Sequence, residues 1–258
     1  MRGNEPTRLQ QGSALFVDFD GTLIDIAPRP DAVSLPAGVV EMLALVHVRL
    51  GGALAIVSGR PIEQLDAFLS PLRIPVAGLH GAERRSASGS ITRLPLADLR
   101  QVTANLQALA DIHPGMLVEA KPGAVALHYR LAPSCEALVQ RAMQAALRQS
   151  PGMSLLHGKM VIELKPAAAS KGLAVDAFMA EPPFVGRIPV FIGDDVTDES
   201  GFTAAQAAGG VGIKIGPGPT QAQHRLATPA DLRAWLQASA EDESIHLPPL
   251  VKRPLEHS

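Results

Sequence analysis

The sequence predicts an α/β protein in which a doubly wound parallel sheet carries an inserted α+β domain. At both ends of the chain, short apolar segments alternate with amphipathic helical segments. Strands that alternate with helices build a parallel sheet covered on both faces. In the middle, the pattern changes to helix-strand-strand and occurs twice, which favours a four-stranded antiparallel sheet. With 258 residues, 47% of them hydrophobic, the chain can bury one large core or two modest ones.

The first part of the parallel sheet is predicted from apolar runs and helix signals. The run ALFVDF is bounded by glycines, which is typical of a buried strand. The next stretch carries one apolar helical face, made of Val39, Leu43, Val46 and Leu50. We therefore expect strands at 14–19, 53–57 and 76–79, and helices at 36–50 and 61–69.

The middle of the chain begins after a polar stretch, ERRSASGS, which is typical of a linker or an exposed hairpin. Two helix-strand-strand units follow, and the α/β pattern resumes at Lys171. The units are expected at 96–111, 115–121 and 124–131, and at 134–149, 153–157 and 160–164. Later helices are expected at 171–180, 199–208 and 229–239, and later strands at 189–193 and 211–215.

These elements divide the chain into two segments of one core with a domain inserted between them. We expect an N-terminal extension at 1–13, core segments at 14–85 and 166–240, the inserted domain at 86–165, and a poorly ordered, Pro-rich tail at 241–258. This design places a cleft over the carboxyl ends of the parallel strands, where ligands bind in such folds.

Composition excludes several functions. Lys and Arg total 23 against 25 Asp and Glu, so the basic excess used to bind nucleic acid is missing. Cys135 is the single cysteine, which leaves no intramolecular disulfide and no cysteine-based zinc site. The first residues lack the apolar run of a signal peptide, and the apolar stretch 39–57 is interrupted by charges. We therefore expect a cytoplasmic protein without a membrane partner.

Acidic side chains follow two strands of the expected parallel sheet. The first strand ends in Asp18-Phe19-Asp20, and residues i and i+2 of a strand share a face. The strand at 189–193 is followed by a second acidic group, Asp194, Asp195 and Asp198. Burying like charges side by side is costly, and a hard cation with oxygen ligands relieves the repulsion. The sequence therefore predicts a Mg²⁺ site at this edge of the sheet.

Anion-binding groups are expected at the same edge. Ser58-Gly59-Arg60 offers a hydroxyl and backbone N–H groups where a helix starts, and Lys171 opens the helix after the insertion. Each feature alone has an ordinary explanation, such as a surface turn, an Asx turn at Asp194 or a solvated lysine. Together, carboxylates for a metal, a hydroxyl, helix amides and a lysine point to phosphoryl transfer.

The motifs resemble those of a known superfamily. DFDGTL (18–23), Ser58-Gly59-Arg60, Lys171 and GDD (193–195) are similar, in order, to the four motifs of the haloacid-dehalogenase-like (HAD) phosphatases. Within that superfamily, GLHGAE (78–83), VEAKPGAVALHYR (118–130), HGKMVIELKP (157–166) and GDDVTDE (193–199) resemble the trehalose-6-phosphate phosphatase family. The resemblance covers roughly residues 14–240 and implies a Rossmann-like core with an α/β cap.

The resemblance implies a Mg²⁺-dependent reaction through an aspartyl-phosphate. Asp18 would be the nucleophile, and Asp20 would protonate the leaving sugar oxygen and then deprotonate the hydrolytic water. Ser58 and Lys171 would hold the phosphoryl oxygens. The implied metal ligands are the Asp18 carboxylate, the Asp20 carbonyl oxygen and Asp194, with Asp195 and Asp198 in support, directly or through water.

The cap would recognise the sugar through polar side chains that offer donors and acceptors. Several charged residues, Lys159 and Lys165 among them, lie on its strands where apolar residues are expected. On pattern alone they indicate an exposed sheet face. His80 fits either a core histidine or the hinge and edge of the site, and Arg60 either packs or pairs locally or reaches the substrate. The implied substrate-binding residues are Gly21, Thr22, Gly59, Arg60 and His80 in the core and Glu119, Lys121, His128, Arg130 and Glu163 in the cap.

Other interpretations keep the fold but change the substrate or remove the reaction. The same core serves phosphatases of sucrose phosphate and of mannosyl-phosphoglycerate, and phosphomannomutases. A catalytically inactive sugar-phosphate sensor or synthase subunit is the alternative from another class. Asp20 argues against it, since a binding module needs no general acid there. The implied partner is a small sugar phosphate, while partnership with the upstream synthase and a monomeric state are both left open.

Overall fold

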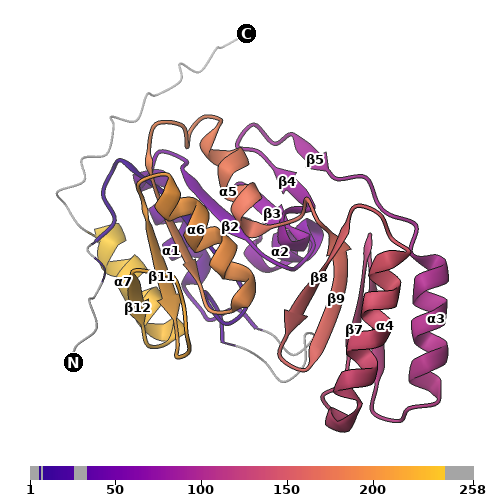
Figure 1. Ribbon diagram of the computed structural model, residues 1–258. Coiled ribbons are helices and arrows are strands. Elements are labelled where there is room, and N and C mark those ends of the chain that lie inside the picture. The colour runs from indigo at the N-terminus through magenta and orange to yellow at the C-terminus, as the bar shows by residue number, and fades with distance from the viewer. Residues whose placement is uncertain (1–5, 7, 26–33, 242–258) are drawn as a thin grey trace.

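The computed structural model describes residues 6, 8–25 and 34–241, and the expected tail beyond Glu241 lies outside these residues. Within them, the chain forms one sheet of eight strands and one of four. Helices cover the larger sheet on both sides, and the smaller sheet is built from the segment inserted between its two halves (Figure 1). The expected fold class is therefore confirmed.

The large sheet has the strand order β12-β11-β10-β1-β2-β3-β4-β5. Its first six members in that order run parallel, β4 pairs antiparallel with β3, and β5 pairs antiparallel with β4. β1 lies between β10 and β2, which reach it from opposite ends of the chain. The strands are β1 (Ser13–Val17), β2 (Leu54–Val57), β3 (Val76–Gly78), β4 (Glu83–Arg85), β5 (Ile91–Arg93), β10 (Ile188–Gly193), β11 (Val211–Ile215) and β12 (His224–Leu226).

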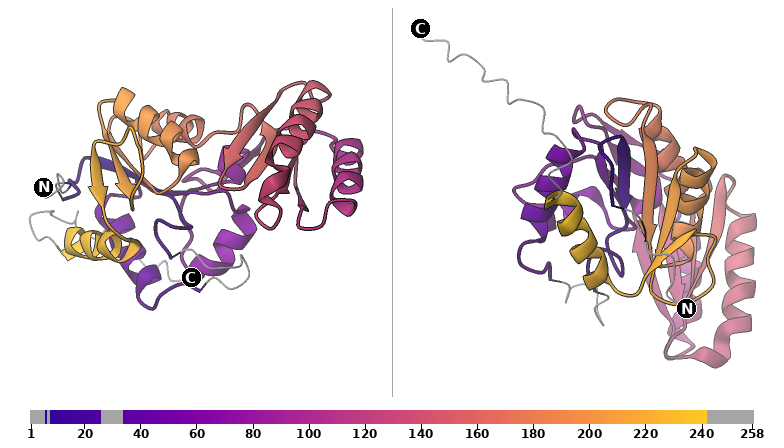
Figure 2. Two further views of the ribbon diagram at one scale, coloured as in Figure 1. Left: turned by 60° about the horizontal axis from the view of Figure 1, so that its bottom comes forward. Right: turned by 90° about the vertical axis from the view of Figure 1, so that its left-hand side faces the viewer.

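Helices pack on both faces of the large sheet, as its uninterrupted apolar strands require. α1 and α7 pack together on one face, and α5 and α6 on the other (Figures 1 and 2). The apolar face expected for the first helix is confirmed, since all four of its members are buried. The helices are α1 (Val39–Arg49), α2 (Ile62–Leu69), α5 (Lys171–Met179), α6 (Glu199–Ala207) and α7 (Pro229–Glu241). Among the described helices, none is long and apolar enough to cross a membrane.

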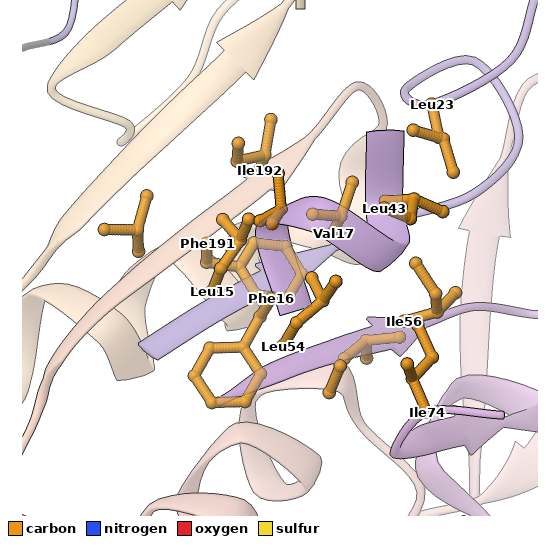
Figure 3. Packing of buried hydrophobic residues seen from close by; sticks show 14 of the residues in the cluster. Leu15, Phe16, Val17, Leu23, Leu43, Leu54, Ile56, Ile74, Phe191 and Ile192 are labelled. Atoms are coloured by element: carbon orange, nitrogen blue, oxygen red, sulfur yellow. The ribbon is translucent and has the colours of Figure 1, made fainter. Parts of the chain in front are cut away.

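The core of the large sheet is centred on β1, whose five residues are all buried. Phe16 stacks on Phe184, with 5.4 Å between ring centroids, and Phe191 meets Phe202 edge to face at 5.6 Å. Figure 3 shows side chains of β1 packed among those of β2 and β10. This tight packing fixes the ends of the three central strands, from which the catalytic candidates emerge.

The smaller sheet has the order β6-β7-β9-β8 and is antiparallel throughout. Its helices lie on the side that faces away from the large sheet (Figure 1). Alternate residues of β7 and β9, such as Leu127 and Ile162, are buried in the apolar cluster with these helices, so the residues between them face the large sheet. The elements are α3 (Arg100–Asp111), β6 (Leu117–Lys121), β7 (Ala124–His128), α4 (Glu136–Arg148), β8 (Met153–Gly158) and β9 (Val161–Pro166).

Three details differ from the expected elements. The polar stretch after β3 is a hairpin of β4 and β5, which extends the large sheet across the expected boundary between residues 85 and 86. The short strand β12 was not expected. The second strand of the first unit ends at His128, before Arg130. The division of the chain into domains at the expected bounds stays a prediction.

Candidate active site

The carboxyl ends of the central parallel strands meet at one edge of the large sheet and carry the expected polar groups. Asp18 follows β1, Ser58 follows β2 and Asp194 follows β10. The N–H of Asp18 donates to the carbonyl of Ile192 at 2.9 Å, and that of Ser58 to the carbonyl of Ala77 at 2.8 Å. Both side chains are buried. The parallel topology thus brings together groups that are far apart in the sequence.

Lys171, the first residue of α5, lies between two buried carboxylates. Its Nζ is 2.7 Å from Asp18 Oδ1 and 2.7 Å from Asp198 Oδ1. Burial alone would lower the pKa of Lys171, but the two carboxylates outweigh it and raise that pKa well above its ordinary value. The lysine therefore stays charged and links the end of β1 to the acidic loop after β10.

Asp198 organises the acidic loop GDDVTDE. Its Oδ2 accepts from the backbone N–H groups of Asp194 and Asp195, each at 3.0 Å. Asp195 Oδ1 in turn accepts from the backbone N–H of Thr197 at 2.7 Å and from its hydroxyl at 2.6 Å. These contacts form a capping box around the single-turn helix η4 (Val196–Asp198). One carboxylate oxygen of Asp195 is thus engaged in hydrogen bonds within the loop.

The electrostatics of the site indicate a shortage of positive charge. Burial raises the pKa of Asp18 well above its usual range, although Lys171 opposes the shift. Burial and the neighbouring Asp198 and Asp195 carboxylates raise the pKa of Asp194 to about 6. Asp195 behaves differently: although burial opposes the shift, Lys171 and the hydrogen bonds from Thr197 lower its pKa. A bound cation would stabilise the ionised carboxylates and so lower their pKa values.

Three carboxylates have the geometry of a metal site. Asp18, Asp194 and Asp198 each offer one oxygen, and these three oxygens lie within 4.8 Å of one another. The Thr22 hydroxyl donates to Asp194 Oδ1 at 3.0 Å and so orients that ligand. Gly21 leaves space for it: the residue has a φ of +80°, and a Cβ there would lie 2.3 Å from Asp194 Oδ2. An all-oxygen donor set suits a hard cation, so the residues present fit Mg²⁺.

Arg60 pairs with Asp20, which is the local alternative considered for this arginine. Its Nε lies 2.6 Å from Asp20 Oδ2 and its Nη2 lies 2.7 Å from Asp20 Oδ1. The guanidinium also lies over the ring of Phe68, 5.2 Å from its centroid. The backbone N–H of Arg60 donates to Ser58 Oγ at 3.1 Å. Arg60, which follows β2, therefore fixes the side chain of Asp20, which follows β1.

The face of the smaller sheet that carries charged side chains, here called the polar face, meets the large sheet at a small cavity. It does so at the edge that carries Asp18, Ser58 and Asp194, here called the catalytic edge. Lys121, Glu163 and Lys165 line the cavity from the smaller sheet, and Gly59 and His80 line it from the large one. Its volume of about 10 Å³ has room for about one water molecule. Lys165 was not among the expected substrate residues. The signal that could have found it is its place two residues after Glu163, on the same face of β9.

The other expected cap residues fall into two groups. Glu119 and His128 lie on the polar face and pair across β6 and β7, with 2.9 Å between Oε2 and Nε2. On the same face, Lys121 Nζ is 2.7 Å from Glu163 Oε2. Arg130 is exposed beyond the end of β7 and is not among the residues that line the cavity. The structure thus brings four of the five expected cap residues onto one sheet face.

His80 occupies a strained position beside the cavity. Leu79 and His80 have φ values of 50° and 56°, in the left-handed region that non-glycine residues rarely adopt. The ring packs against Gly59, where a Cβ would lie 2.7 Å from His80 Cε1. Its Nδ1 is shielded from solvent and has no hydrogen-bond partner among the described residues. Burial and the nearby lysines lower the pKa of His80 to about 3, so the ring is neutral.

The fold is that of the haloacid-dehalogenase-like hydrolases. The structure of such a hydrolase from B. subtilis superposes with a TM-score of 0.64 over 86% of this chain and 96% of that one. At 15% identity this likeness shows the fold alone.

Sequence comparison assigns the chain to one family. The trehalose-phosphatase family model matches residues 16–232, and the chain belongs to that family. The trehalose-6-phosphate phosphatase of Escherichia coli K12 is 46% identical over 235 residues, covering 90% of this chain and 88% of that protein. A bifunctional trehalose-6-phosphate synthase/phosphatase of Thermoproteus tenax is 34% identical over 86% of this chain and 31% of its own length. A solved structure described as a trehalose-6-phosphate phosphatase related protein is 28% identical, with a TM-score of 0.72 over 88% of this chain and 96% of that one.

Proposed function

We propose that this chain hydrolyses trehalose 6-phosphate to trehalose and phosphate in a Mg²⁺-dependent reaction. The observation that carries the proposal is the buried group of Asp18, Lys171 and Asp198 with Asp194 beside it, at the catalytic edge of the sheet. It combines a carboxylate nucleophile, a fixed ammonium and an oxygen-rich cation site, which phosphoryl transfer requires. The activity for which the Escherichia coli relative is named supports this choice of substrate.

In the first half of the reaction, an oxygen of Asp18 attacks phosphorus and the bond between phosphorus and the sugar oxygen breaks. Asp20 gives a proton to the departing oxygen from the carboxyl oxygen that Arg60 releases, and trehalose leaves. Lys171 and the Ser58 hydroxyl bind phosphoryl oxygens and stabilise the charge that develops on them. The product of this step is a phosphoryl group on Asp18.

In the second half, Asp20 takes a proton from water as the water oxygen attacks phosphorus. The bond between phosphorus and Asp18 breaks, phosphate leaves and Asp18 is regenerated. Asp20 is protonated again and ready for the next cycle. Both aspartates are thus returned to their starting state, and the net change is hydrolysis of one phosphate ester by one water molecule.

A bound Mg²⁺ would supply charge neutralisation for the phosphoryl group. Asp18, Asp194 and Asp198 are positioned to hold it, and the carbonyl oxygen of Asp20 completes the set that we propose. Asp195 supports this set through the loop, where its Oδ1 accepts from Thr197. Thr22 and Gly21 also act on the geometry of Asp194, in addition to the substrate contacts expected of them.

We propose that the polar face of the smaller sheet recognises the disaccharide. Lys121, Glu163 and the pair of Glu119 with His128 offer both donors and acceptors, as sugar hydroxyls require. His80, neutral and with an unpartnered Nδ1, offers one more group at the edge of this face. The junction has room for about one water molecule, so the sugar enters as the smaller sheet moves away from the large one.

A panel of phosphate esters tests this proposal. Phosphate release is measured from trehalose 6-phosphate, sucrose 6-phosphate, mannosyl-3-phosphoglycerate and glucose 6-phosphate, each with and without Mg²⁺. We expect Mg²⁺-dependent turnover with the highest kcat/KM for trehalose 6-phosphate. A higher kcat/KM for another ester would replace the substrate, and binding without turnover of any of them would favour a non-catalytic sugar-phosphate subunit.

We extend the proposal to a partner protein and to a location in the cell. The Thermoproteus tenax relative is named as a synthase and phosphatase in one chain, so the synthase that supplies the substrate is a candidate partner here. Size-exclusion chromatography with and without that synthase tests this partnership and the monomeric state that we propose for the isolated chain. Cell fractionation tests the cytoplasmic location.

A further inference from the structure

A second cavity lies at the edge of the large sheet opposite to the catalytic groups. Its lining includes the turn Gly51-Gly52 before β2, the dipeptide Ile74-Pro75 before β3 and the turn 86–89 between β4 and β5. The first two precede the amino ends of parallel strands and the turn lies beside them, whereas the catalytic candidates follow the carboxyl ends. Its volume is about 390 Å³, within the range of small-molecule pockets. None of its lining residues has a role in the proposed reaction.

Positive charge surrounds this cavity. Arg73 and Arg85 line it, and its lining contains no Asp or Glu. A third guanidinium, that of Arg187, is adjacent: its Nη2 would be 3.1 Å from a Cβ on Gly51. The carboxylate that pairs with the two lining arginines is Asp66. Within the described part of the chain, these three guanidinium groups are opposed by one paired carboxylate, that of Asp66, which favours an anionic ligand.

The two lining arginines differ in how firmly they are held. Arg85 donates to both oxygens of Asp66, each at 2.7 Å, and to the carbonyl of Ile74 at 2.9 Å. Arg73 Nη1 is 3.7 Å from Asp66, beyond hydrogen-bond distance, and its side chain is 70% exposed. Arg73 can therefore turn its donors toward a ligand without losing a hydrogen bond to Asp66, while Arg85 stays fixed and contributes charge.

Other polar groups converge on the same space. Ser86 and Ser88 lie on the β4–β5 turn with their hydroxyl oxygens 2.8 Å apart, and the Ser88 hydroxyl donates to Ser90 Oγ at 3.2 Å, an exposed contact that a ligand oxygen could replace. His47, near the end of α1, lines the cavity, and its Nδ1 is shielded from solvent without a hydrogen-bond partner among the described residues. Because this nitrogen is shielded from the solvent that reaches the cavity, it is not a contact for an occupant, and the donors available to a ligand are Arg73 and the two serines.

We propose that this cavity, which we call the arginine cavity, is a binding site for a phosphate-type oxyanion, with Arg73, Ser86 and Ser88 as donors. Guanidinium and hydroxyl groups are the side chains that best match phosphate oxygens. The ligand is free phosphate or the phosphate group of a hexose-sized monoester, since the volume admits either. Because the site lies across the sheet from the reacting groups, a ligand bound there is not in position to react.

A site-resolved NMR titration tests this proposal with the full chain in metal-free buffer. Inorganic phosphate, glucose 6-phosphate and chloride of equal ionic strength are added separately. The amide signals of Gly51, Gly52, Ser88 and Gly89 report on the arginine cavity, and those of the catalytic edge report separately on phosphate bound there. We expect saturable shifts of the four signals with phosphate or glucose 6-phosphate and none with chloride. The tighter of the two ligands identifies the source of the oxyanion.

Two variants make the titration decisive. Arg73→Gln should weaken binding at the four signals about tenfold or more, because one charge-assisted donor is lost. Arg100→Gln, which changes another exposed arginine on α3, should leave binding unchanged. The proposal is overturned if the four signals do not shift, if chloride shifts them equally, or if Arg73→Gln binds as tightly as the unaltered chain.

Discussion

Arg60 holds both carboxylate oxygens of Asp20, at 2.6 Å and 2.7 Å. A two-point contact of this kind fixes the plane of the carboxylate as well as its position. Because the backbone of Arg60 also binds Ser58 Oγ, the orientation of Asp20 is tied to the phosphate-binding turn after β2. We therefore assign Arg60 as a positioning residue for the proton transfer that we propose for Asp20.

Replacing Arg60 should impair the protonation of a poor leaving group most. Arg60→Ala is expected to lower kcat for trehalose 6-phosphate by about 10- to 100-fold, since misplacing a general acid forfeits much of its contribution. Turnover of p-nitrophenyl phosphate, whose leaving group needs little protonation, should fall less. Both values come from steady-state phosphate release.

A double variant distinguishes this role from direct phosphate binding. In an Asp20→Asn background, Arg60→Ala should cause little further loss, because the group that it positions is already gone. A full additional loss in that background would assign Arg60 to the substrate instead.

Activity should depend on Mg²⁺ held by the three clustered carboxylates. Chelation is expected to abolish turnover and Mg²⁺ to restore it, while Ca²⁺ supports little turnover because its looser coordination misaligns the reacting groups. Mg²⁺ should also raise the Tm of the unaltered chain and of an Asp231→Asn control but not that of Asp194→Asn. Full activity after verified metal removal would refute the metal role of Asp194.

Substitutions on the polar face of the smaller sheet should lower kcat/KM for the sugar ester and not for a generic ester. Glu163→Gln keeps the size of the side chain but weakens its contact with Lys121, and it should lower kcat/KM for trehalose 6-phosphate by about 10- to 100-fold. The kcat/KM for p-nitrophenyl phosphate should change little. Glu136→Gln, on the outer helix α4, serves as the control. Equal losses on both esters for Glu163→Gln would indicate a structural role.

His80 should make the fold sensitive to acid. Its folded pKa of about 3 lies below its ordinary value of 6.5, so between these values the unfolded chain binds more protons and the free energy of unfolding falls as pH falls. At pH 5 the loss should be about 2 kcal/mol relative to neutral pH. Asn tolerates a positive φ, so His80→Asn should remove this loss while keeping the backbone.

Denaturant unfolding at pH 7.5 and pH 5 measures the effect. The exposed His157→Asn serves as the control and should retain the full pH dependence. If His80→Asn loses as much stability at pH 5 as the unaltered chain, the acid sensitivity has another source.

The sequence pattern was sufficient for the central strands and for the catalytic edge. Buried parallel strands are continuous apolar runs, and their carboxyl ends can be located from the residues that follow, which is why Asp18, Ser58 and Asp194 were placed correctly beside one another. β12 could not be found in this way, because its three residues, HRL, carry no apolar run. The polar hairpin of β4 and β5 was ambiguous for the same reason, since edge strands need only one packed face.

Contacts between side chains of different motifs could not be predicted from the sequence. The contact of Arg60 with Asp20 joins residues forty positions apart, and no local rule chooses it over a contact with substrate. The exposed position of Arg130 depends on where β7 ends, and strand ends are the least certain part of a pattern. The arginine cavity depends on residues from α1, from the turns before β2 and β3, and from a hairpin, which only the folded sheet brings together.

The role of Asp18 as nucleophile is the centre of this account, and one comparison tests it most directly. Phosphate release from trehalose 6-phosphate is measured at saturating Mg²⁺ for the unaltered chain and for Asp18→Asn, after circular dichroism and Tm have shown that the variant is folded. The variant keeps the size of the side chain but lacks the attacking charge, so turnover should fall by several orders of magnitude. Retention of more than about a tenth of the activity, a change of only about 1.4 kcal/mol in the barrier, would contradict the assignment of Asp18 as nucleophile.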